Sequence, residues 1–485
     1  MRARAIGAAS PVHGLARRSV GFFDVLGQSV AALAPSAAAT TIPMLTFAVA
    51  GGGSAVAVVI TAVIALGVAA SVNVFAKRVA AAGSIYTFVS LGLGPRGSLV
   101  SGAAMLLGYG LIAVFELFAA AHFVGHALGD GPVIPLILGV LLGAALLAVL
   151  LGGIRLSTRL MLLVEVVTLA TLVVVVAVLL TVLPFEPADL LPRPVGLDRI
   201  VLGVVVTMSA FVGFESAAAL GVEAKRPFAT IPRVLLWTVA GSGAVFVFVA
   251  VAGLVAAGAL GFDQISGDLP FDAVAELYGA GWAATVLDLL VGFSFFAAAV
   301  AATTAFVRLL FSLSREGMLP RALGRTSRRT GVPVIATLAC VPLVLAPLIL
   351  RAAGMDLRGA MDTIVVAAVA AFVLGYVLVC AAVWPFLRRI GEPAVWPIAR
   401  AVVAAVVLGA SLVAFLAIAA VSGQAGGVIL YAVALAAAVA ALALMRIRPG
   451  GGRRGVARDV PLASDVLGGA RVLAAAAAPG EGERP

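Results

Sequence analysis

Long apolar runs separated by short polar segments recur along the whole chain. A helix needs about 20 mostly apolar residues to cross roughly 30 Å of hydrocarbon. Runs of this length predict about twelve membrane-spanning helices, at 23–48, 53–76, 97–126, 132–152, 157–183, 199–222, 231–259, 281–313, 332–350, 362–385, 396–422 and 426–446. An even number of crossings would place both ends of the chain on the same side of the membrane.

Basic residues are concentrated in alternate loops of this pattern. Of the 32 lysines and arginines, all except Arg193, Arg199, Arg351 and Arg358 fall in the tails, in the loops after every second helix or, for Arg308, at the inner end of a helix. The positive-inside rule therefore predicts that both termini are cytoplasmic. The same distribution explains the net charge of +10 without a basic face, so nucleic acid is not an expected partner.

Composition argues against a soluble protein, and the lack of catalytic motifs argues against an enzyme. Hydrophobic residues make up 63% and charged residues 11%, whereas a soluble domain carries about 25% charged residues. Cys340 and Cys380 lie inside apolar runs without metal-ligand spacing and are interpreted as core residues. His122 and His126 are spaced as a zinc pair, but no third ligand is apparent. Because no nucleophile or metalloenzyme motif appears, we expect neither catalysis nor a cofactor.

Two of the predicted helices carry a helix breaker near the middle of the membrane. Pro35 interrupts the first helix, where backbone hydrogen bonding should lapse around Leu33 to Ala37. Gly213 lies just before Glu215 at the centre of helix 199–222. Irregular backbone at this depth is tolerated where it lines a cavity or contacts protein. Two such breaks, five helices apart, predict inverted repeats with a binding site near the midplane.

Three stretches resemble a known family, the amino acid–polyamine–organocation transporters. They read AKRVAAAGSIYTFVSLGLGPRGSLVSGAAMLLGY, AFVGFESAAALGVEAKRPFATIPR and TTAFVRLLFSLSREGMLPRALGRTSRRTGVPV. The resemblance implies an all-α integral membrane fold of the LeuT type. Its first repeat would be residues 23–195 and its second 196–390, followed by two further helices in 391–446. Residues 1–22 and 447–485 would be cytoplasmic tails, the second of them disordered.

The resemblance also implies where a substrate binds. In the family, backbone amides at the first break hold the substrate's carboxylate, and carbonyls at the second break hold its ammonium group. In this sequence the two breaks comprise Ala34, Pro35, Ser36, Ala37 and Ala38, and Ala210, Phe211, Val212, Gly213 and Phe214. Ser209 stands where some relatives have a gating tryptophan, so Phe211 or Phe214 would close the site. Tyr109 either caps this pocket or packs at a helix contact.

Gating and ion coupling have several candidate residues. Glu215 matches a gating acid of some relatives, with a structural helix-start carboxylate as the alternative. Glu116 is a second intramembrane acid, which could attract an amine or carry a proton. Thr303 and Thr304 resemble a hydroxyl pair that binds sodium together with helix 1 carbonyls, here that of Ala34. Threonines also bond to carbonyls of their own helix, so the coupling ion is predicted to be H⁺ or Na⁺.

Two further acids have simpler interpretations. Asp288 is expected to be a solvated residue at the outer mouth. Glu165 is expected to pair with Arg155 or Arg159.

Together these features predict a secondary active transporter in the cytoplasmic membrane of a bacterium. It would move an amino acid or a related amine by alternating access, with membrane lipid as its other partner. The alternatives are a polyamine or organic-amine exchanger of the same fold, a membrane-embedded enzyme and a transport-inactive sensor. Neither the particular substrate nor the oligomeric state follows from the sequence.

Overall fold

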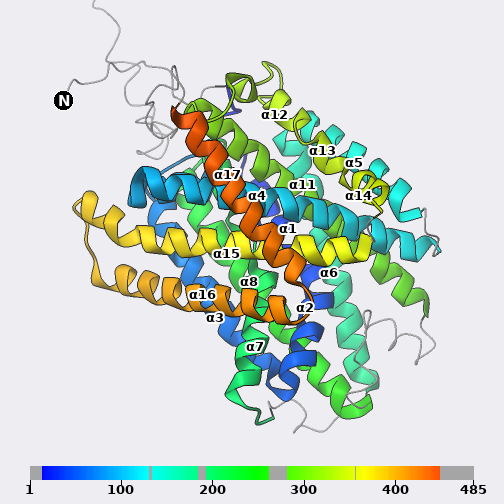
Figure 1. Ribbon diagram of the computed structural model, residues 1–485. Coiled ribbons are helices and arrows are strands. Elements are labelled where there is room, and N and C mark those ends of the chain that lie inside the picture. Colours follow the sequence, from blue (N-terminus) through cyan, green and yellow to red (C-terminus); the bar gives the residue numbers. More distant parts are fainter. Residues whose placement is uncertain (1–13, 130–133, 184–192, 261–280, 355–356, 448–485) are drawn as a thin grey trace, which may run out of the picture.

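The computed structural model describes residues 14–129, 134–183, 193–260, 281–354 and 357–447, and this part of the chain is built from helices joined by loops (Figure 1). Its α-helices are α1 (Phe22–Leu33), α2 (Pro35–Ala50), α3 (Ser54–Ala76), α4 (Ser84–Leu128), α5 (Ile134–Gly152), α6 (Ile154–Val182), α7 (Leu197–Thr207), α8 (Pro227–Leu260), α11 (Gly281–Arg315), α12 (Val334–Leu338), α13 (Val341–Val344), α14 (Ala346–Ala352), α15 (Leu357–Arg389), α16 (Val395–Val421) and α17 (Ala425–Ile447). Short 3-10 helices are η1 (Gly51–Gly53), η3 (Met208–Phe211), η4 (Phe214–Leu220) and η5 (Arg321–Gly324). Most of the two predicted tails lies outside the described residues: residues 1–13 of the N-terminal tail (1–22) and residues 448–485 of the C-terminal tail (447–485).

Eleven segments within the described residues are long and apolar enough to cross a membrane. The first of them, Phe22–Ala76, has 55 residues and contains α1, α2 and α3. At 1.5 Å per residue such a segment would span roughly 80 Å, more than twice the hydrocarbon thickness. Counting α1–α2 and α3 as separate crossings would give twelve. That number remains a prediction, whereas the all-α membrane class is confirmed.

Away from the two breaks, two helices differ most from their predicted extent. The helix expected at 97–126 is preceded in α4 by a second helical segment that begins at Ser84, and the two are joined through a kink at Gly94 (φ 72°, ψ −158°), directly before Pro95. The helix expected at 332–350 is instead three short helices, α12, α13 and α14. Pro342 and Pro347 lie in the first turns of α13 and α14. Each proline lacks the amide that would continue the preceding helix.

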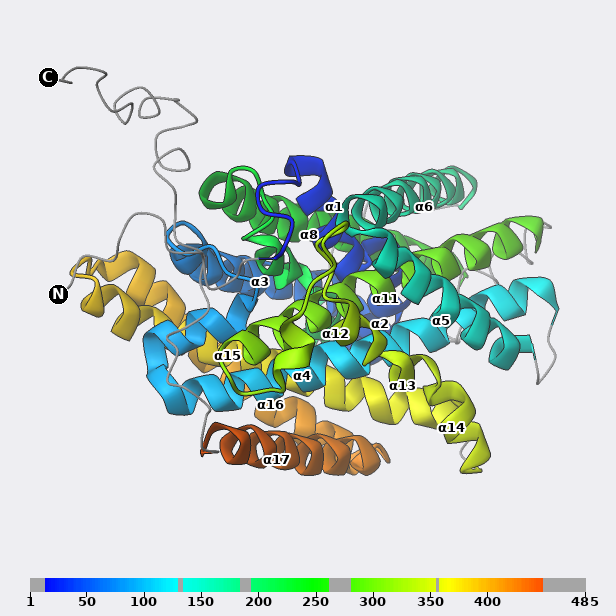
Figure 2. The same cartoon turned by 90° about the horizontal axis from the view of Figure 1, so that it is seen from above.

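The long helices α4, α11 and α15 form the centre of the bundle, and α4 packs against both of the others. α16 and α17 lie along one side of the molecule, against α15 and α4 (Figure 2). α1 and α2 lie on the opposite side of this central layer, next to α6 and α8. The division into two repeats remains a prediction.

Loops rich in arginine meet at one end of the bundle. We call it the basic end and define it as residues 14–20, 77–83, 221–226, 316–333 and 389–394. The amide of Ser19 donates to the carbonyl of Glu223 (2.7 Å), and that of Lys225 to the carbonyl of Val20 (2.9 Å). Arg78 pairs with Glu392 at 2.7 Å. This grouping follows from the alternation of basic loops along the chain; its position in the cytoplasm remains a prediction.

Candidate functional site at two helix breaks

The first break is confined to Ala34, between α1 and α2. Ala34 has left-handed backbone angles (φ 48°, ψ 59°), which cost roughly 1–2 kcal/mol for a residue with a Cβ. Its amide donates to the carbonyls of Val30 (2.9 Å) and Ala31 (3.0 Å), and its carbonyl accepts the amide of Ala38 (2.8 Å). Pro35 is suited to the first position of α2, since it has no amide to satisfy. The interruption is therefore narrower than the predicted lapse, and Ser36, Ala37 and Ala38 lie in the first turn of α2.

The second break is longer than its sequence predicts. α7 ends at Thr207 and is followed by η3, by the extended residue Val212 and by Gly213 in the left-handed region (φ 92°). The chain then continues as the 3-10 helix η4 and not as an α-helix. A 3-10 helix has poorer hydrogen-bond geometry than an α-helix. The interruption therefore extends over more than three turns, with Gly213 at its sharpest point.

The two breaks are in direct contact. A Cβ at Gly213 would lie 2.4 Å from the carbonyl oxygen of Ala32, so only glycine permits this approach. The hydroxyl of Ser29 donates to the carbonyl of Phe214 (2.7 Å), and that of Ser216 to the carbonyl of Gln28 (3.2 Å). Hydroxyls thus satisfy carbonyls across the two interrupted helices. The fold brings together two sequence features that lie far apart in the chain.

Glu215 is completely buried beside the second break. One carboxylate oxygen accepts the hydroxyl of Tyr109 on α4 (2.7 Å), and the other accepts that of Tyr376 on α15. The Tyr376 oxygen also accepts the amide of Gly213 (3.0 Å). The hydroxyl of Ser84 donates to the backbone carbonyl of Glu215 (3.1 Å). The acid therefore ties the second break to α4 and α15 through two phenol hydroxyls.

Sequence reasoning missed Tyr376. It lies in a continuous apolar run, AAFVLGYVLVC, where an aromatic residue gives no signal of its own. A buried tyrosine hydroxyl needs a hydrogen-bond partner, and the sequence offers few intramembrane acceptors. Matching Tyr376 with Glu215 would have required the relative positions of α15 and η4.

The other predicted site residues are packed around the breaks. Phe211 contacts the ring of Phe246 edge-on at 5.1 Å, and Phe214 lies 5.6 Å from the ring of Tyr376. Pro35, Ala37 and Ala210 are buried. The hydroxyl of Ser209 donates to the carbonyl of Val206 in the preceding turn (2.7 Å).

Glu116 is not part of the Glu215 cluster. It is buried on α4, seven residues after Tyr109. Its Oε2 has no hydrogen-bond partner within the described residues. An unpartnered buried carboxylate oxygen is costly. No contact of this oxygen in the described residues therefore supports the prediction that Glu116 attracts an amine or carries a proton.

The candidate cation ligands are the hydroxyls of Thr303 and Thr304 and the carbonyl of Ala34. No contact within the described residues brings these three oxygens together. The hydroxyl of Thr303 donates to the carbonyl of Ala299 on its own helix (2.7 Å), and the Ala34 carbonyl accepts an amide of α2. These are the ordinary helix bonds that were the alternative to ion binding. The sodium assignment therefore remains a prediction without support from this geometry.

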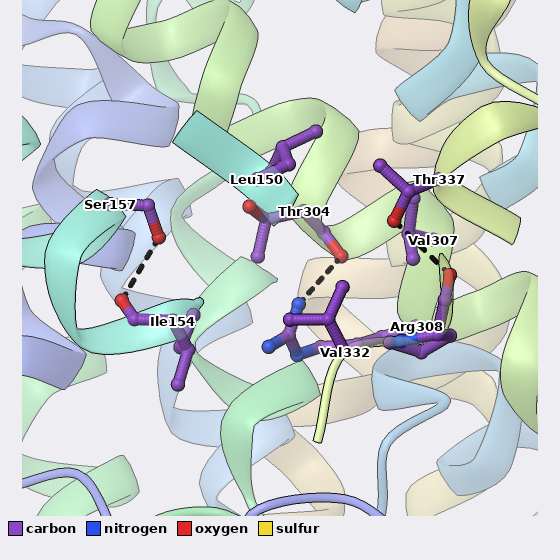
Figure 3. Close-up of a pocket in the computed structure, with 9 residues that line it drawn as sticks. Leu150, Ile154, Ser157, Thr304, Val307, Arg308, Val332 and Thr337 are labelled. Carbon is purple, nitrogen blue, oxygen red and sulfur yellow. Dashed lines mark hydrogen bonds between the residues drawn. The ribbon is translucent and has the colours of Figure 1, made fainter. Parts of the chain in front are cut away.

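Thr304 lines a small pocket near the basic end (Figure 3). Its hydroxyl is buried without a partner in the described residues. Its carbonyl accepts from Arg308 (3.2 Å). Ser157 and Thr337 line the same pocket, which has room for roughly one water molecule. Arg308 also forms a buried, bidentate ion pair with Glu223 (2.7 and 3.0 Å).

One expectation about acids is wrong, and another is wrong for Arg159, one of its two candidate partners. Asp288 is buried, not solvated, and contacts Nδ1 of His126 at 2.6 Å. Glu165 bonds to the hydroxyls of Ser36 and Ser294, while Arg159 pairs with Asp24 at 3.3 Å. The side chain of Arg155 lies outside the described residues.

The described residues contain no group of three possible metal ligands, and His126 is hydrogen-bonded to Asp288.

Comparison with known proteins decides the class. A family model described as amino acid permease matches residues 24–442. The chain belongs to the amino acid permease family. This permease is similar to the branched-chain amino acid permease BcaP of Bacillus subtilis, with 23% identity over 351 residues, 66% of this chain and 72% of that protein. It is also similar to BcaP of Lactococcus lactis, with 28% identity over 294 residues, 54% of this chain and 61% of that protein.

A solved structure shows the same fold. A crystal structure of a variant of the Eremococcus coleocola manganese transporter superposes on this permease with a TM-score of 0.52. The match covers 87% of this chain and 94% of that one, at 14% sequence identity. The LeuT-type fold implied by the sequence is thereby confirmed. The permease is a multi-pass amino acid transporter and not an enzyme.

Proposed function

We propose that this permease moves a neutral, apolar amino acid across the cytoplasmic membrane of a bacterium by alternating access. The observation that carries the proposal is the direct contact between the break at Ala34 and the break at Gly213. Substrate binds where these breaks separate from each other. Two of the relatives are branched-chain amino acid permeases, which favours leucine, isoleucine and valine.

Backbone groups at the breaks supply the recognition of the amino acid. The amides of Ser36 and Ala37 open α2, and the N-terminus of a helix favours an anion such as the substrate carboxylate. Carbonyls released between Ala210 and Phe214 attract the ammonium group. The lining side chains Ala37, Ala38 and Ala210 are small and apolar, which suits an aliphatic side chain.

Aromatic residues and Glu215 act as the gate. Phe211 and Phe214 cover the second break. Ser209, which stands where some relatives have a gating tryptophan, has too small a side chain to do so. Glu215 holds the closed arrangement through Tyr109 and Tyr376. Opening the site requires these two hydrogen bonds to break.

The basic end closes the pathway on the cytoplasmic side. Arg308 and Glu223 form their ion pair there without solvent, at 5% and 2% exposure. Arg18 donates to the carbonyls of Gly221 and Val222 (3.3 and 3.1 Å). These bonds hold the N-terminal segment against the chain that follows η4. The positive-inside rule supports this orientation.

Reconstituted transport tests the proposal. Purified permease in liposomes is expected to take up radiolabelled leucine and to exchange it with internal leucine, isoleucine or valine. Lysine, polyamines and other amines serve as the competing panel, each with and without sodium, alongside thermal-shift measurements. Exchange of polyamines but not of leucine would replace this proposal with the organic-amine exchanger. Stabilisation by leucine without any counterflow would instead indicate a sensor.

A further inference from the structure

A second buried acid, Glu165, joins three helices next to the first break. Glu165 on α6, Ser36 on α2 and Ser294 on α11 are each at most 1% exposed. Ser36 Oγ lies 3.0 Å from Glu165 Oε2 and 2.8 Å from Ser294 Oγ. Ser294 Oγ is also hydrogen-bonded to Glu165 Oε1. The carboxyl group and the two hydroxyls therefore form a closed ring of three hydrogen-bond contacts.

Counting hydrogens indicates the protonation state of this ring. Each serine hydroxyl can donate one hydrogen, and an ionised carboxylate can donate none. With Glu165 ionised, two hydrogens serve three contacts, so in one of them two oxygen lone pairs would face each other. With Glu165 protonated, the acid donates to Ser36, Ser36 donates to Ser294, and Ser294 donates back to the acid. All three contacts are then satisfied.

We propose that Glu165 carries the coupling proton of this permease, and that it is protonated in this closed arrangement. The proposal rests on the proposed transport function and assigns its coupling ion. Release of H⁺ leaves a carboxylate and removes one hydrogen from the ring, which weakens the attachment of α2 to α6 and α11. Uptake of H⁺ restores the ring. Because Ser36 lies two residues after the break at Ala34, proton occupancy and the geometry of the substrate site change together.

The surroundings of Glu165 allow both charge states to form. No basic side chain is among its hydrogen-bond partners in the described residues. The first turn of α2, where Ser36 lies, has the partial positive charge that favours the ionised form once the ring opens. The other charged groups on α6 and on the helices packed against it are Asp24, Arg155, Arg159, Arg233, Asp288, Arg308 and Arg315. Four of these are paired elsewhere: Asp24 and Arg159 with each other, Asp288 with His126 and Arg308 with Glu223.

The substitution Glu165→Gln separates proton transfer from packing. A glutamine amide donates to Ser36 and accepts from Ser294, so it reproduces the protonated ring but cannot lose a proton. In liposomes, a gradient of about one pH unit can drive up to about tenfold leucine accumulation for one proton per substrate. Wild-type permease is expected to show this accumulation, together with leucine-dependent proton uptake reported by an internal pH dye. Glu165→Gln should lose both while retaining leucine counterflow.

Asp362→Asn is the matched control, since it alters an exposed carboxylate near the start of α15, away from both breaks and from the basic end, and should leave accumulation unchanged. Wild-type accumulation in Glu165→Gln would overturn the proposal. So would accumulation by wild-type permease that follows a sodium gradient and ignores the pH gradient. Loss of counterflow in a folded Glu165→Gln protein would also overturn it, because that outcome indicates a binding role.

Infrared spectroscopy tests the proton without transport. Near neutral pH, subtraction of the Glu165→Gln spectrum from the wild-type spectrum should leave the C=O band of a protonated carboxylic acid. Absence of that band would contradict the hydrogen count. If no amino acid were transported but the band were present, the proposed function would fail while the assignment of a proton to Glu165 would stand.

Discussion

At the scale of single residues, two buried acids dominate this permease, and the hydrogen-bond partners that the described part of the chain gives them are hydroxyls and not basic side chains. Glu215 accepts two tyrosine hydroxyls, and Glu165 shares a ring with two serines. A hydrogen bond between neutral groups is worth about 0.5–1.5 kcal/mol, and one to a charged group about 1.5–3 kcal/mol. The closed arrangement therefore depends on a few hydroxyl groups, which conservative substitutions can remove one at a time.

Removal of one hydroxyl from the gate is expected to weaken the closed state. Tyr376→Phe leaves Glu215 with Tyr109 alone and leaves the amide of Gly213 without its acceptor. A loss of about 1.4 kcal/mol would shift the balance between closed and open forms about tenfold. Leucine counterflow in liposomes should therefore change severalfold from the wild-type rate. Tyr431→Phe, on the peripheral helix α17, is the control and should transport normally; equal rates in all three proteins would disprove the gate.

At the scale of elements, the two interrupted helices place backbone amides and carbonyls in the middle of the membrane. The first interruption requires a left-handed alanine followed by proline, and the second requires a left-handed glycine against the backbone of α1. Such strained positions are stable only when the surrounding structure holds them. The contact between Gly213 and Ala32 is the most restrictive of these.

A methyl group at this contact should separate the two breaks. Gly213→Ala would place its Cβ 2.4 Å from the Ala32 carbonyl oxygen, at a φ of 92°. We expect reduced thermal stability in detergent and loss of leucine uptake. Gly241→Ala, in α8, meets no atom within 4 Å and should fold and transport as wild type. Normal uptake by Gly213→Ala would show that this close approach is not needed for transport.

At the scale of the whole molecule, the basic loops lie together at one end and the pair His126–Asp288 lies at the outer ends of α4 and α11, by the predicted orientation. Cysteine labelling can test that orientation because Cys340 and Cys380 are both buried. In intact cells, Ala353→Cys should react with a membrane-impermeant maleimide. Arg328→Cys, at the exposed basic end, should react only after permeabilisation. The reverse pattern would invert the predicted topology, and the unsubstituted protein should stay unlabelled.

The sequence by itself determined the membrane class, the apolar segments, the alternation of basic loops and the presence of breaks near Pro35 and Gly213. These are local properties: hydropathy depends on runs of about 20 residues, and a proline or glycine acts on its own turn. The extent of each break was less predictable. The conformation of Ala34 and the 3-10 form of η4 depend on what packs against them.

Only the tertiary structure decided which groups satisfy the buried acids. Tyr376 is 161 residues from Glu215, and both serines are 129 residues from Glu165. Local pairing rules favoured Arg155 or Arg159 for Glu165 and solvent for Asp288; the interpretation of Asp288 was wrong, and Arg159 pairs with Asp24 instead. A buried acid bonds to whichever polar group the packing brings within about 3 Å, and that distance is a property of helices meeting across the bundle. The sequence thus identified single residues of the site, and only their contacts in the folded protein indicate how they act together.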